Sequence, residues 1–270
     1  MSTILTRIVE TKKREVERAK QARSIESLEE RIADQESPRN FYAAVRGSNS
    51  EEIRLIAEIK KASPSGGLLR ADFDPVELAC VYHQNGASAL SVLTDEEYFQ
   101  GSLESIAAVK EAVPLPVLRK DFLIDEYQIY ESRAAGADAV LLIVEILDPQ
   151  RLMDMLILAN ELRMTSLIEV HEAESLLRFR SLVGFPLRGY SLLGINNRDL
   201  TTQSVDLGTT ARMISLLDDD EVPVVAESGV KTRGDVERLK RAGATALLVG
   251  ETFMRADDVG AKVRELFGNP

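Results

Sequence analysis

Five short apolar segments of the chain each end in charged or amide side chains. They span residues 57–60, 118–122, 167–170, 194–198 and 225–229. Segments of this length, rich in Val, Ile and Leu, predict strands buried on both faces. A charged side chain buried there without a partner or a use costs several kcal/mol. Because such charged or amide side chains recur at the same end of successive strands, we expect them to converge in one pocket.

Side chains alternate between the two faces of a strand, so the polar groups can be assigned to one face. In the first strand Glu58 and Lys60 share a face, and Ile59 lies on the other. The same alternation gives six candidate catalytic residues: Glu58, Lys60, Lys120, Glu169, Asn196 and Glu227. We expect them to surround one ligand. Ion pairs that only stabilise the ends of the strands are the alternative.

Lysines and carboxylates in contact form an acid–base set. A lysine held by carboxylates stays protonated and can donate a proton, and a carboxylate in a dry site has a raised pKa and can accept one. Each such group typically contributes about 10²–10⁴-fold in rate. The two histidines, His83 and His171, stand at unrelated positions, so we expect no metal site. His171 follows the fifth strand and is interpreted as a residue that begins the next helix.

Strand-like segments fall near residues 53–60, 87–94, 116–122, 139–144, 165–170, 192–198, 223–228 and 246–251, with helical patterns between them. Gly86, Gly136 and Gly243 each follow a helical pattern, as at a left-handed C-cap. Eight strands repeating at roughly 27 residues predict an α/β fold, a (β/α)8 TIM barrel over residues 49–270, whose strand ends form the catalytic mouth. A doubly wound open sheet is the alternative, but no Gly-x-Gly-x-x-Gly follows the first strand.

The last two strands carry candidate phosphate-binding residues. Gly229 and Gly250 each stand just past a strand, and Ser228 and Glu251 adjoin them. Barrels often bind phosphate here through backbone N–H groups, and glycine lets the backbone approach the anion closely. The loop at residues 63–67 adds hydroxyl groups next to Lys60. This loop is either part of the phosphate site, able to move as a lid, or a mobile surface loop.

Residues 1–48 show a helical pattern, with apolar residues such as Ile4, Leu5 and Ile8 at a spacing of three or four among Lys, Arg and Glu. We expect an N-terminal helical extension packed on the barrel. A partner-binding segment or a lid is the alternative.

The formal net charge is −11, and no basic stripe is present. This charge argues against nucleic-acid and anionic-membrane partners. The sequence contains no run of 18 apolar residues, so it predicts no membrane span. The single cysteine, Cys80, excludes an internal disulfide and suits a reducing cytoplasm. We therefore expect a cytoplasmic protein that binds a small molecule, as a monomer or, alternatively, a weak homodimer.

Five motifs, read in order, now allow a comparison with a known family. They are Ala-Glu-Ile-Lys-Lys-Ala-Ser-Pro-Ser at 57–65, Lys-Asp-Phe at 120–122, Leu-Ile-Glu-Val at 167–170, Gly-Ile-Asn-Asn-Arg-Asp-Leu at 194–200 and Ala-Glu-Ser-Gly at 226–229. Together they resemble the indole-3-glycerol phosphate synthase family over almost the whole chain. The resemblance implies ring closure of 1-(2-carboxyphenylamino)-1-deoxy-D-ribulose 5-phosphate with loss of CO₂ and water, in tryptophan biosynthesis. It also implies a lyase that uses no cofactor and no metal.

The resemblance also implies roles for individual residues. Lys120 resembles the general acid that protonates the substrate ketone, and Glu169 resembles a general base. Lys60 and Glu58 resemble a pair that assists dehydration, with the base of that step left open between Glu58 and Glu169. The remaining residues resemble positioning groups (Asn196, Glu227, Ser228), a contact to the carboxylate (Arg198), the apolar pocket for the anthranilate ring (Phe99, Phe122, Leu141, Leu200) and the phosphate site (Ser63, Gly229, Gly250, the N–H of Glu251).

Two other functions remain as alternatives. A barrel like phosphoribosylanthranilate isomerase would use a thiol base at the end of the first strand. Here that position holds Lys60, and Cys80 lies in a helical pattern. A non-catalytic barrel that binds a phosphorylated ligand is the second alternative, and the acid–base residues argue against it.

Overall fold

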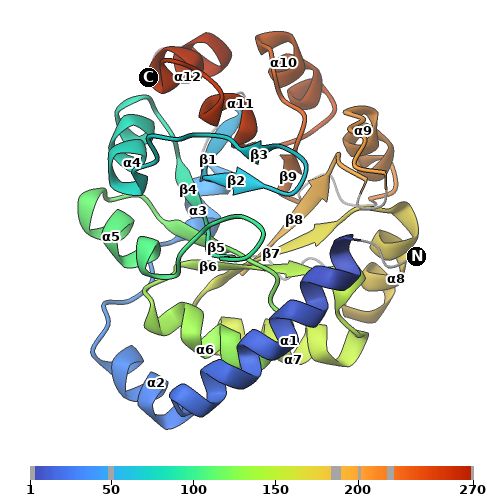
Figure 1. Ribbon diagram of the computed structural model, residues 1–270. Coiled ribbons are helices and arrows are strands. Elements are labelled where there is room, and N and C mark those ends of the chain that lie inside the picture. The colour runs from blue at the N-terminus through green and yellow to red at the C-terminus, as the bar shows by residue number, and fades with distance from the viewer. Residues whose placement is uncertain (1–3, 48–51, 184–189, 200–201, 218–221, 269–270) are drawn as a thin grey trace.

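The computed structural model describes residues 4–47, 52–183, 190–199, 202–217 and 222–268. Eight parallel strands close into a barrel in the order β1-β10-β9-β8-β7-β6-β5-β4 (Figure 1). The strands are β1 (Arg54–Ile59), β4 (Ala89–Leu93), β5 (Val117–Lys120), β6 (Ala139–Ile143), β7 (Thr165–Val170), β8 (Ser191–Asn196), β9 (Val224–Glu227) and β10 (Ala246–Val249). Each lies within two residues of a predicted segment, which confirms the (β/α)8 barrel.

A ring of helices surrounds the strands (Figure 1). It consists of α4 (Pro75–Gln84), α5 (Glu104–Ala112), α6 (Glu126–Ala134), the short η1 (Val144–Ile146), α7 (Pro149–Glu161), α8 (Ala173–Val183), α9 (Gly208–Ile214), α10 (Arg233–Arg241), α11 (Glu251–Met254) and α12 (Val259–Phe267). Gly86, Gly136 and Gly243 have φ values of 86°, 94° and 102°. These left-handed conformations after α4, α6 and α10 confirm the predicted C-caps.

The alternation of side chains divides the core in two. Leu55, Ala57 and Ile59 of β1 belong to the outer cluster, which packs on the helices. Ile56 belongs to the inner cluster that fills the barrel, together with Leu118 and other inward residues of later strands. The predicted assignment of faces is therefore correct, and it places the polar ends of the inward rows at the mouth.

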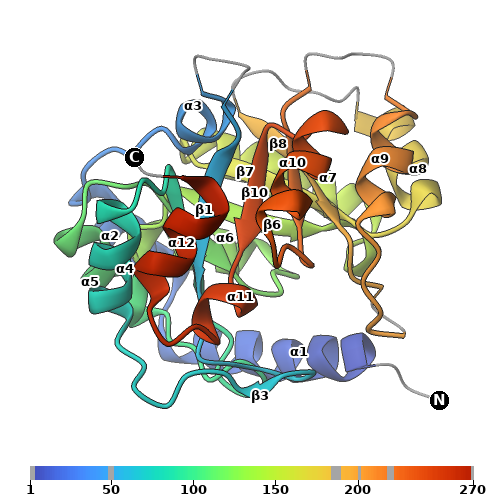
Figure 2. The same cartoon turned by 90° about the horizontal axis from the view of Figure 1, so that it is seen from above.

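Three helices precede the barrel: α1 (Ile4–Ala22), α2 (Ile25–Ala33) and α3 (Phe41–Arg46). Side chains of α3 join the inner cluster, so this helix closes the amino-terminal end of the barrel. Figure 2 shows α1 at the opposite end, where it lies across the mouth. The division of the chain at residues 48 and 49 stays a prediction, because residues 48–51 lie outside the described part of the chain.

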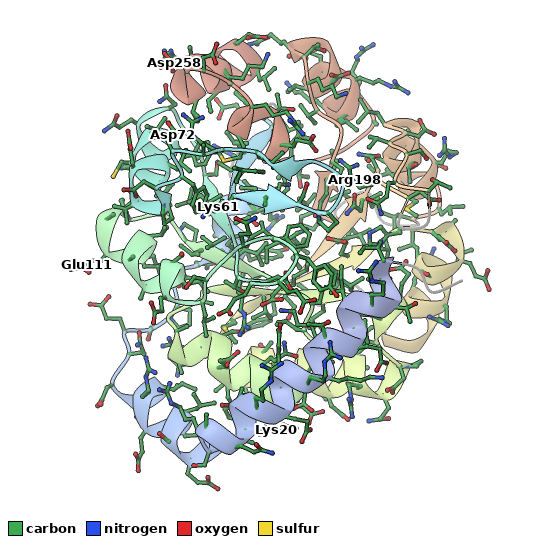
Figure 3. The ribbon with its side chains drawn as sticks, in the orientation of Figure 1. Lys20, Lys61, Asp72, Glu111, Arg198 and Asp258 are labelled. Carbon is green, nitrogen blue, oxygen red and sulfur yellow. The ribbon has the colours of Figure 1, made fainter. Side chains whose placement is uncertain are left out.

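A buried lysine attaches α1 to the barrel. Lys12 Nζ lies 2.8 Å from Asp95 Oδ2 and 2.9 Å from Asp121 Oδ1, and all three side chains are at most 4% exposed. Burial opposes the charge of Lys12, but the two aspartates outweigh it and hold the pKa of Lys12 above its ordinary value. A second link to α1, between Lys20 and Asp125, is partly exposed, and Figure 3 shows Lys20 on the outside of the helix.

A separate hairpin of β2 (Ala62–Ser63) and β3 (Gly67–Leu68) lies over the mouth near α1 (Figure 2). The predicted loop at residues 63–67 is therefore the turn of this hairpin. In the described part of the chain, the helices are too short or too polar to cross a membrane.

Candidate active site

A cavity of about 590 Å³ lies at the carboxyl ends of the barrel strands. Its lining includes the predicted site residues Glu58, Lys60, Ser63, Phe99, Lys120, Phe122, Leu141, Glu169, Asn196, Arg198, Glu227, Ser228, Gly229, Gly250 and Glu251. Leu200, the remaining predicted residue, lies outside the described residues. The structure thus brings every described candidate to one cavity. The strand pattern predicted this convergence for the six acid–base and amide residues, and the family resemblance added the others.

Lys120, at the end of β5, stands between two carboxylates from other strands. Its Nζ donates to Glu169 Oε2 at 2.7 Å and to Glu227 Oε2 at 2.5 Å. Burial opposes the charge of this lysine, but the carboxylates of Glu169 and Glu227 raise its pKa above the ordinary value. Lys120 therefore carries a proton at neutral pH and can donate it or polarise a carbonyl.

The two carboxylates beside Lys120 differ in their surroundings. Burial and the nearby charge of Glu169 raise the pKa of Glu227. For Glu169, burial acts in the same direction, but Lys120 and His171 outweigh it and lower the pKa. Two like charges that share one cation do not ionise together at low cost. Glu169 is therefore the ionised member, and Glu227 is the one that readily holds a proton.

Gly194 on β8 makes room for Glu227. A Cβ built on Gly194 would lie 2.6 Å from Glu227 Oε1. That oxygen is buried and has no hydrogen-bond partner among the described residues. The glycine thus fixes the space in which the carboxylate of Glu227 sits.

Glu58 and Lys60, on the inward row of β1, form a direct ion pair. Glu58 is buried and packs against Gly250, where a Cβ would lie 2.9 Å from the Cβ of Glu58. We predicted Gly250 as a glycine that lets the backbone approach phosphate. The structure adds a second reason, because any larger residue would displace the Glu58 side chain.

Asn196 connects the acid–base groups to Arg198. Its Nδ2 donates to Glu169 Oε1 at 3.2 Å, and its Oδ1 accepts from the Arg198 N–H at 3.0 Å. Arg198 lies beyond the end of β8 (Figure 3), and its Nη2 donates to Glu251 Oε2 at 3.3 Å. Glu251 also accepts from Arg255 at 3.0 Å. The Glu251 carboxylate is thus directed at two guanidinium groups, as expected for a residue that could offer phosphate only its backbone.

The wall formed after β9 has strained backbone. Ser228 has a φ of 66° and Gly229 has a φ of 93°. A positive φ is uncommon for a residue other than glycine, and such conformations gather at functional sites. Lysine and arginine residues also line the cavity, among them Lys60, Lys231, Arg255 and Lys262. An anion is the ligand that this sector favours.

The opposite wall is apolar. The rings of Phe99 and Phe122 pack with centroids 6.0 Å apart at an angle of 39°. Leu141 adjoins them in the cavity lining. A planar aromatic group fits such a wall, which places aromatic and anionic recognition in different parts of one cavity.

A family model described as indole-3-glycerol phosphate synthase matches residues 5–266. This chain belongs to the indole-3-glycerol phosphate synthase family. The function predicted from the motifs is confirmed at this level: the chain is a decarboxylating carbon–carbon lyase of tryptophan biosynthesis.

Relatives named indole-3-glycerol phosphate synthase match along their whole length. One from Neisseria gonorrhoeae (strain NCCP11945) is 48% identical over 268 residues, which cover 99% of this chain and 100% of the relative. Another from Rhodospirillum rubrum is 46% identical over 269 residues, with the same coverage of both chains.

Solved structures share the barrel at low identity. A 3-hexulose-6-phosphate synthase has a TM-score of 0.60 at 18% identity and covers 79% of this chain and 98% of its own. A mutant tryptophan synthase alpha-subunit from Pyrococcus furiosus has a TM-score of 0.56 at 12% identity and covers 80% and 98%. At these identities, the likeness between these two structures and the present chain shows the fold alone.

Several cavity residues of this indole-3-glycerol phosphate synthase family member were not predicted as site residues. Ile4, Leu5 and Ile8 reach the cavity from α1. Their spacing predicted the helix, but the spacing alone does not tell which surface the apolar face covers. His171 precedes α8, as its interpretation as a helix-beginning residue requires, yet its ring also contacts Glu169. Only tertiary structure shows this second contact.

Proposed function

We propose that the chain converts 1-(2-carboxyphenylamino)-1-deoxy-D-ribulose 5-phosphate into indole-3-glycerol phosphate, CO₂ and water, with side chains of the barrel mouth carrying every proton transfer. The observation that supports this proposal most is the position of Lys120 between Glu169 and Glu227. A protonated lysine and an ionised carboxylate in one buried cavity form an acid–base pair ready for use at neutral pH.

The first step forms the carbon–carbon bond of the new ring. The aryl carbon that bears the carboxylate attacks the ketone, and Lys120 gives a proton to the ketone oxygen as it becomes a hydroxyl group. The bond from the aryl carbon to the carboxylate then breaks, CO₂ leaves, and its electron pair restores the aromatic ring. A cation fixed beside the developing alkoxide lowers this barrier without reorganising at the moment of reaction.

The second step removes water. The hydroxyl group takes a proton and leaves, while a base removes a proton from the neighbouring carbon to complete the indole. In this proposal Glu169 is a general base, and the Glu58–Lys60 pair assists the departure of water. Asn196 and Glu227 hold the reacting groups in place through their contacts with Glu169 and Lys120.

Binding uses both ends of the cavity. In this proposal the anthranilate ring packs on Phe99, Phe122 and Leu141, with Leu200 as a further predicted contact, and Arg198 meets the carboxylate. The phosphate binds at Ser63, Ser228, Gly229, Gly250 and the backbone N–H of Glu251. Anchoring both ends orients the aryl carbon toward the ketone and can supply about 7–11 kcal/mol of the barrier reduction in well-oriented cases.

We further propose a cytoplasmic location and a monomeric state, with a weak homodimer as the alternative that light scattering would detect. The single cysteine and the biosynthetic role support the location. The net charge of −11 supports the absence of a nucleic-acid partner. We treat residues 1–48 as a helical extension and residues 49–270 as the catalytic barrel.

Product fluorescence tests the activity directly. The protein has no tryptophan, so an indole product would appear against little protein signal. We expect Lys120→Ala to lower kcat by at least about 10²–10⁴-fold, because the general acid is gone, while the substrate still binds in calorimetry. Lys20→Ala, on the outside of α1, is the matched control and should keep full activity.

Two results would contradict this proposal at different points. Well-folded wild-type protein that makes no indole product would refute the activity. Normal turnover by Lys120→Ala would leave the activity in place but remove Lys120 from its role.

A further inference from the structure

His171 lies immediately behind Glu169, outside the lining of the cavity. Its Nε2 is 3.0 Å from Glu169 Oε1, an ion-pair contact rather than a well-aligned hydrogen bond. Its Nδ1 is 3.1 Å from Glu145 Oε2, and its backbone N–H donates to Glu145 Oε1 at 2.9 Å. Glu145, from η1, therefore holds both the backbone and the ring of His171.

Both ring nitrogens of His171 thus face carboxylates. A neutral imidazole has one N–H and one lone pair, so one nitrogen would direct its lone pair at a negative oxygen. When both carboxylates are ionised, only the doubly protonated ring satisfies both contacts. Among the described residues, the charged groups that face the ring are Glu145 from η1 and Glu169 from β7. The buried geometry therefore calls for an imidazolium.

This cation is placed asymmetrically with respect to the carboxylates around Lys120. Glu169 receives Lys120 on Oε2, and both Asn196 and His171 lie next to its Oε1. Glu227 shares Lys120, but its Oε1 has no hydrogen-bond partner among the described residues. One carboxylate is therefore near two cations, and the other is near one.

We propose that His171, held by Glu145, is a positioning residue that decides which of the two carboxylates beside Lys120 is ionised, and so selects Glu169 over Glu227 as the base. His171 does not touch the substrate in this proposal and acts through Glu169. The inference rests on the proposed role of Glu169 as general base. It follows that His171, which lies outside the cavity lining, determines which carboxylate of the cavity acts as the base.

The charge state of His171 can be measured in the wild-type protein. The chain has two histidines, and His83 is exposed on α4, so ¹⁵N-detected ring spectra of the wild type and of His83→Gln assign both. Burial would lower the pKa of His171, but the contacts with Glu145 and Glu169 raise it to about 10. A neutral His171 ring at pH 7.5 would overturn the proposal, whatever the variants do.

His171→Gln tests the consequence for catalysis. Loss of an opposite charge at this distance raises a carboxyl pKa by about 1–3 units, so the acid limb of the kcat profile should move upward by about 1–3 pH units. KM should stay within about threefold, because the contact with substrate is unchanged. Glu145→Gln should move the limb in the same direction by less, and His83→Gln should not move it.

The outcomes separate this inference from the proposed function. Wild-type turnover together with an inactive Glu169→Gln would support Glu169 as the base. If the acid limb of His171→Gln then coincided with that of the wild type, His171 would be a structural residue and the inference would fail alone. If His171→Gln did not fold, Glu145→Gln and the wild-type ring spectra would still decide.

Discussion

Replacing Gly194 with alanine tests how tightly the barrel interior positions its catalytic carboxylates. A Cβ at this position would lie 2.6 Å from Glu227 Oε1, 3.3 Å from Leu167 Cδ1 and 3.4 Å from Glu169 Cα. Ordinary contact begins near 3.4 Å, so the Glu227 carboxylate has to move by about 0.8 Å. The other oxygen of Glu227 is held by Lys120 at 2.5 Å. The methyl group therefore acts directly on the Lys120–Glu227 bond.

The size of the effect follows from these distances. A displacement of about 1 Å in an active site can cost about 10²-fold in rate, and we expect a fall in kcat of that order for Gly194→Ala. Overpacking a dense core costs about 1–3 kcal/mol of unfolding free energy. For a chain of this length that cost corresponds to a fall of about 2–5 °C in melting temperature.

The assay combines indole fluorescence for kcat with calorimetry for the melting temperature. Gly234→Ala is a matched control in α10, because its Cβ would meet only Thr232 Oγ1, at 3.6 Å. Alanine is favoured over glycine inside a helix by about 1 kcal/mol, so this control should keep kcat and melt no lower than the wild type. If Gly194→Ala kept the kcat and the melting temperature of the wild type, a Cβ at this position would not displace Glu227. If it lost stability but kept kcat, Glu227 would have no role in positioning.

Two further predictions concern stability. Lys12→Met should lower the unfolding free energy by about 3–5 kcal/mol, because buried Asp95 loses its cation and Asp121 keeps only Arg119. The exposed neighbour Lys13→Met is the control, and equal urea midpoints for the two variants would contradict the prediction. The raised pKa of His171, about 10, predicts that its stabilisation is complete below pH 6.5 and is lost as the pH rises toward 10. Urea unfolding should show this decline, and His171→Gln should flatten it; parallel curves for both proteins would show that His171 is not the group involved.

The strand pattern was enough to predict that the charged and amide residues at the strand ends meet at the mouth. Charged residues such as Lys120 and Glu169 were recognisable because they end apolar strands, and the period of two gave their common face. The closed barrel then brings those ends together, although the residues are far apart in sequence. The signal was strong because it combined burial, which sequence indicates well, with a simple repeat.

The contacts behind these residues could not be predicted in the same way. The roles of Gly194 and Gly250 depend on which side chain of a neighbouring strand points into the missing Cβ position. Which side chain lies there depends on the stagger between neighbouring strands, and the sequence of one strand does not determine that stagger. Likewise, His171 and Glu145 meet because β6 and β7 are neighbours. Glycine and histidine occur in many loops, so their types alone did not indicate these contacts.

The sequence of the N-terminal helix α1 indicated more about its contacts than we inferred from it. Leu5 and Ile8 line the cavity, and Lys12 follows four residues after Ile8, a spacing that keeps it on the same face of α1. We expected this extension to pack on the barrel, with a partner-binding segment or a lid as the alternative, and we did not assign a contact to Lys12. A lysine continuing an apolar face is costly unless acids meet it, and Asp95 and Asp121 stand just past β4 and β5. The same face thus closes the cavity at one end and binds the strand ends at the other, so the position of α1 and the shape of the apolar wall are not independent.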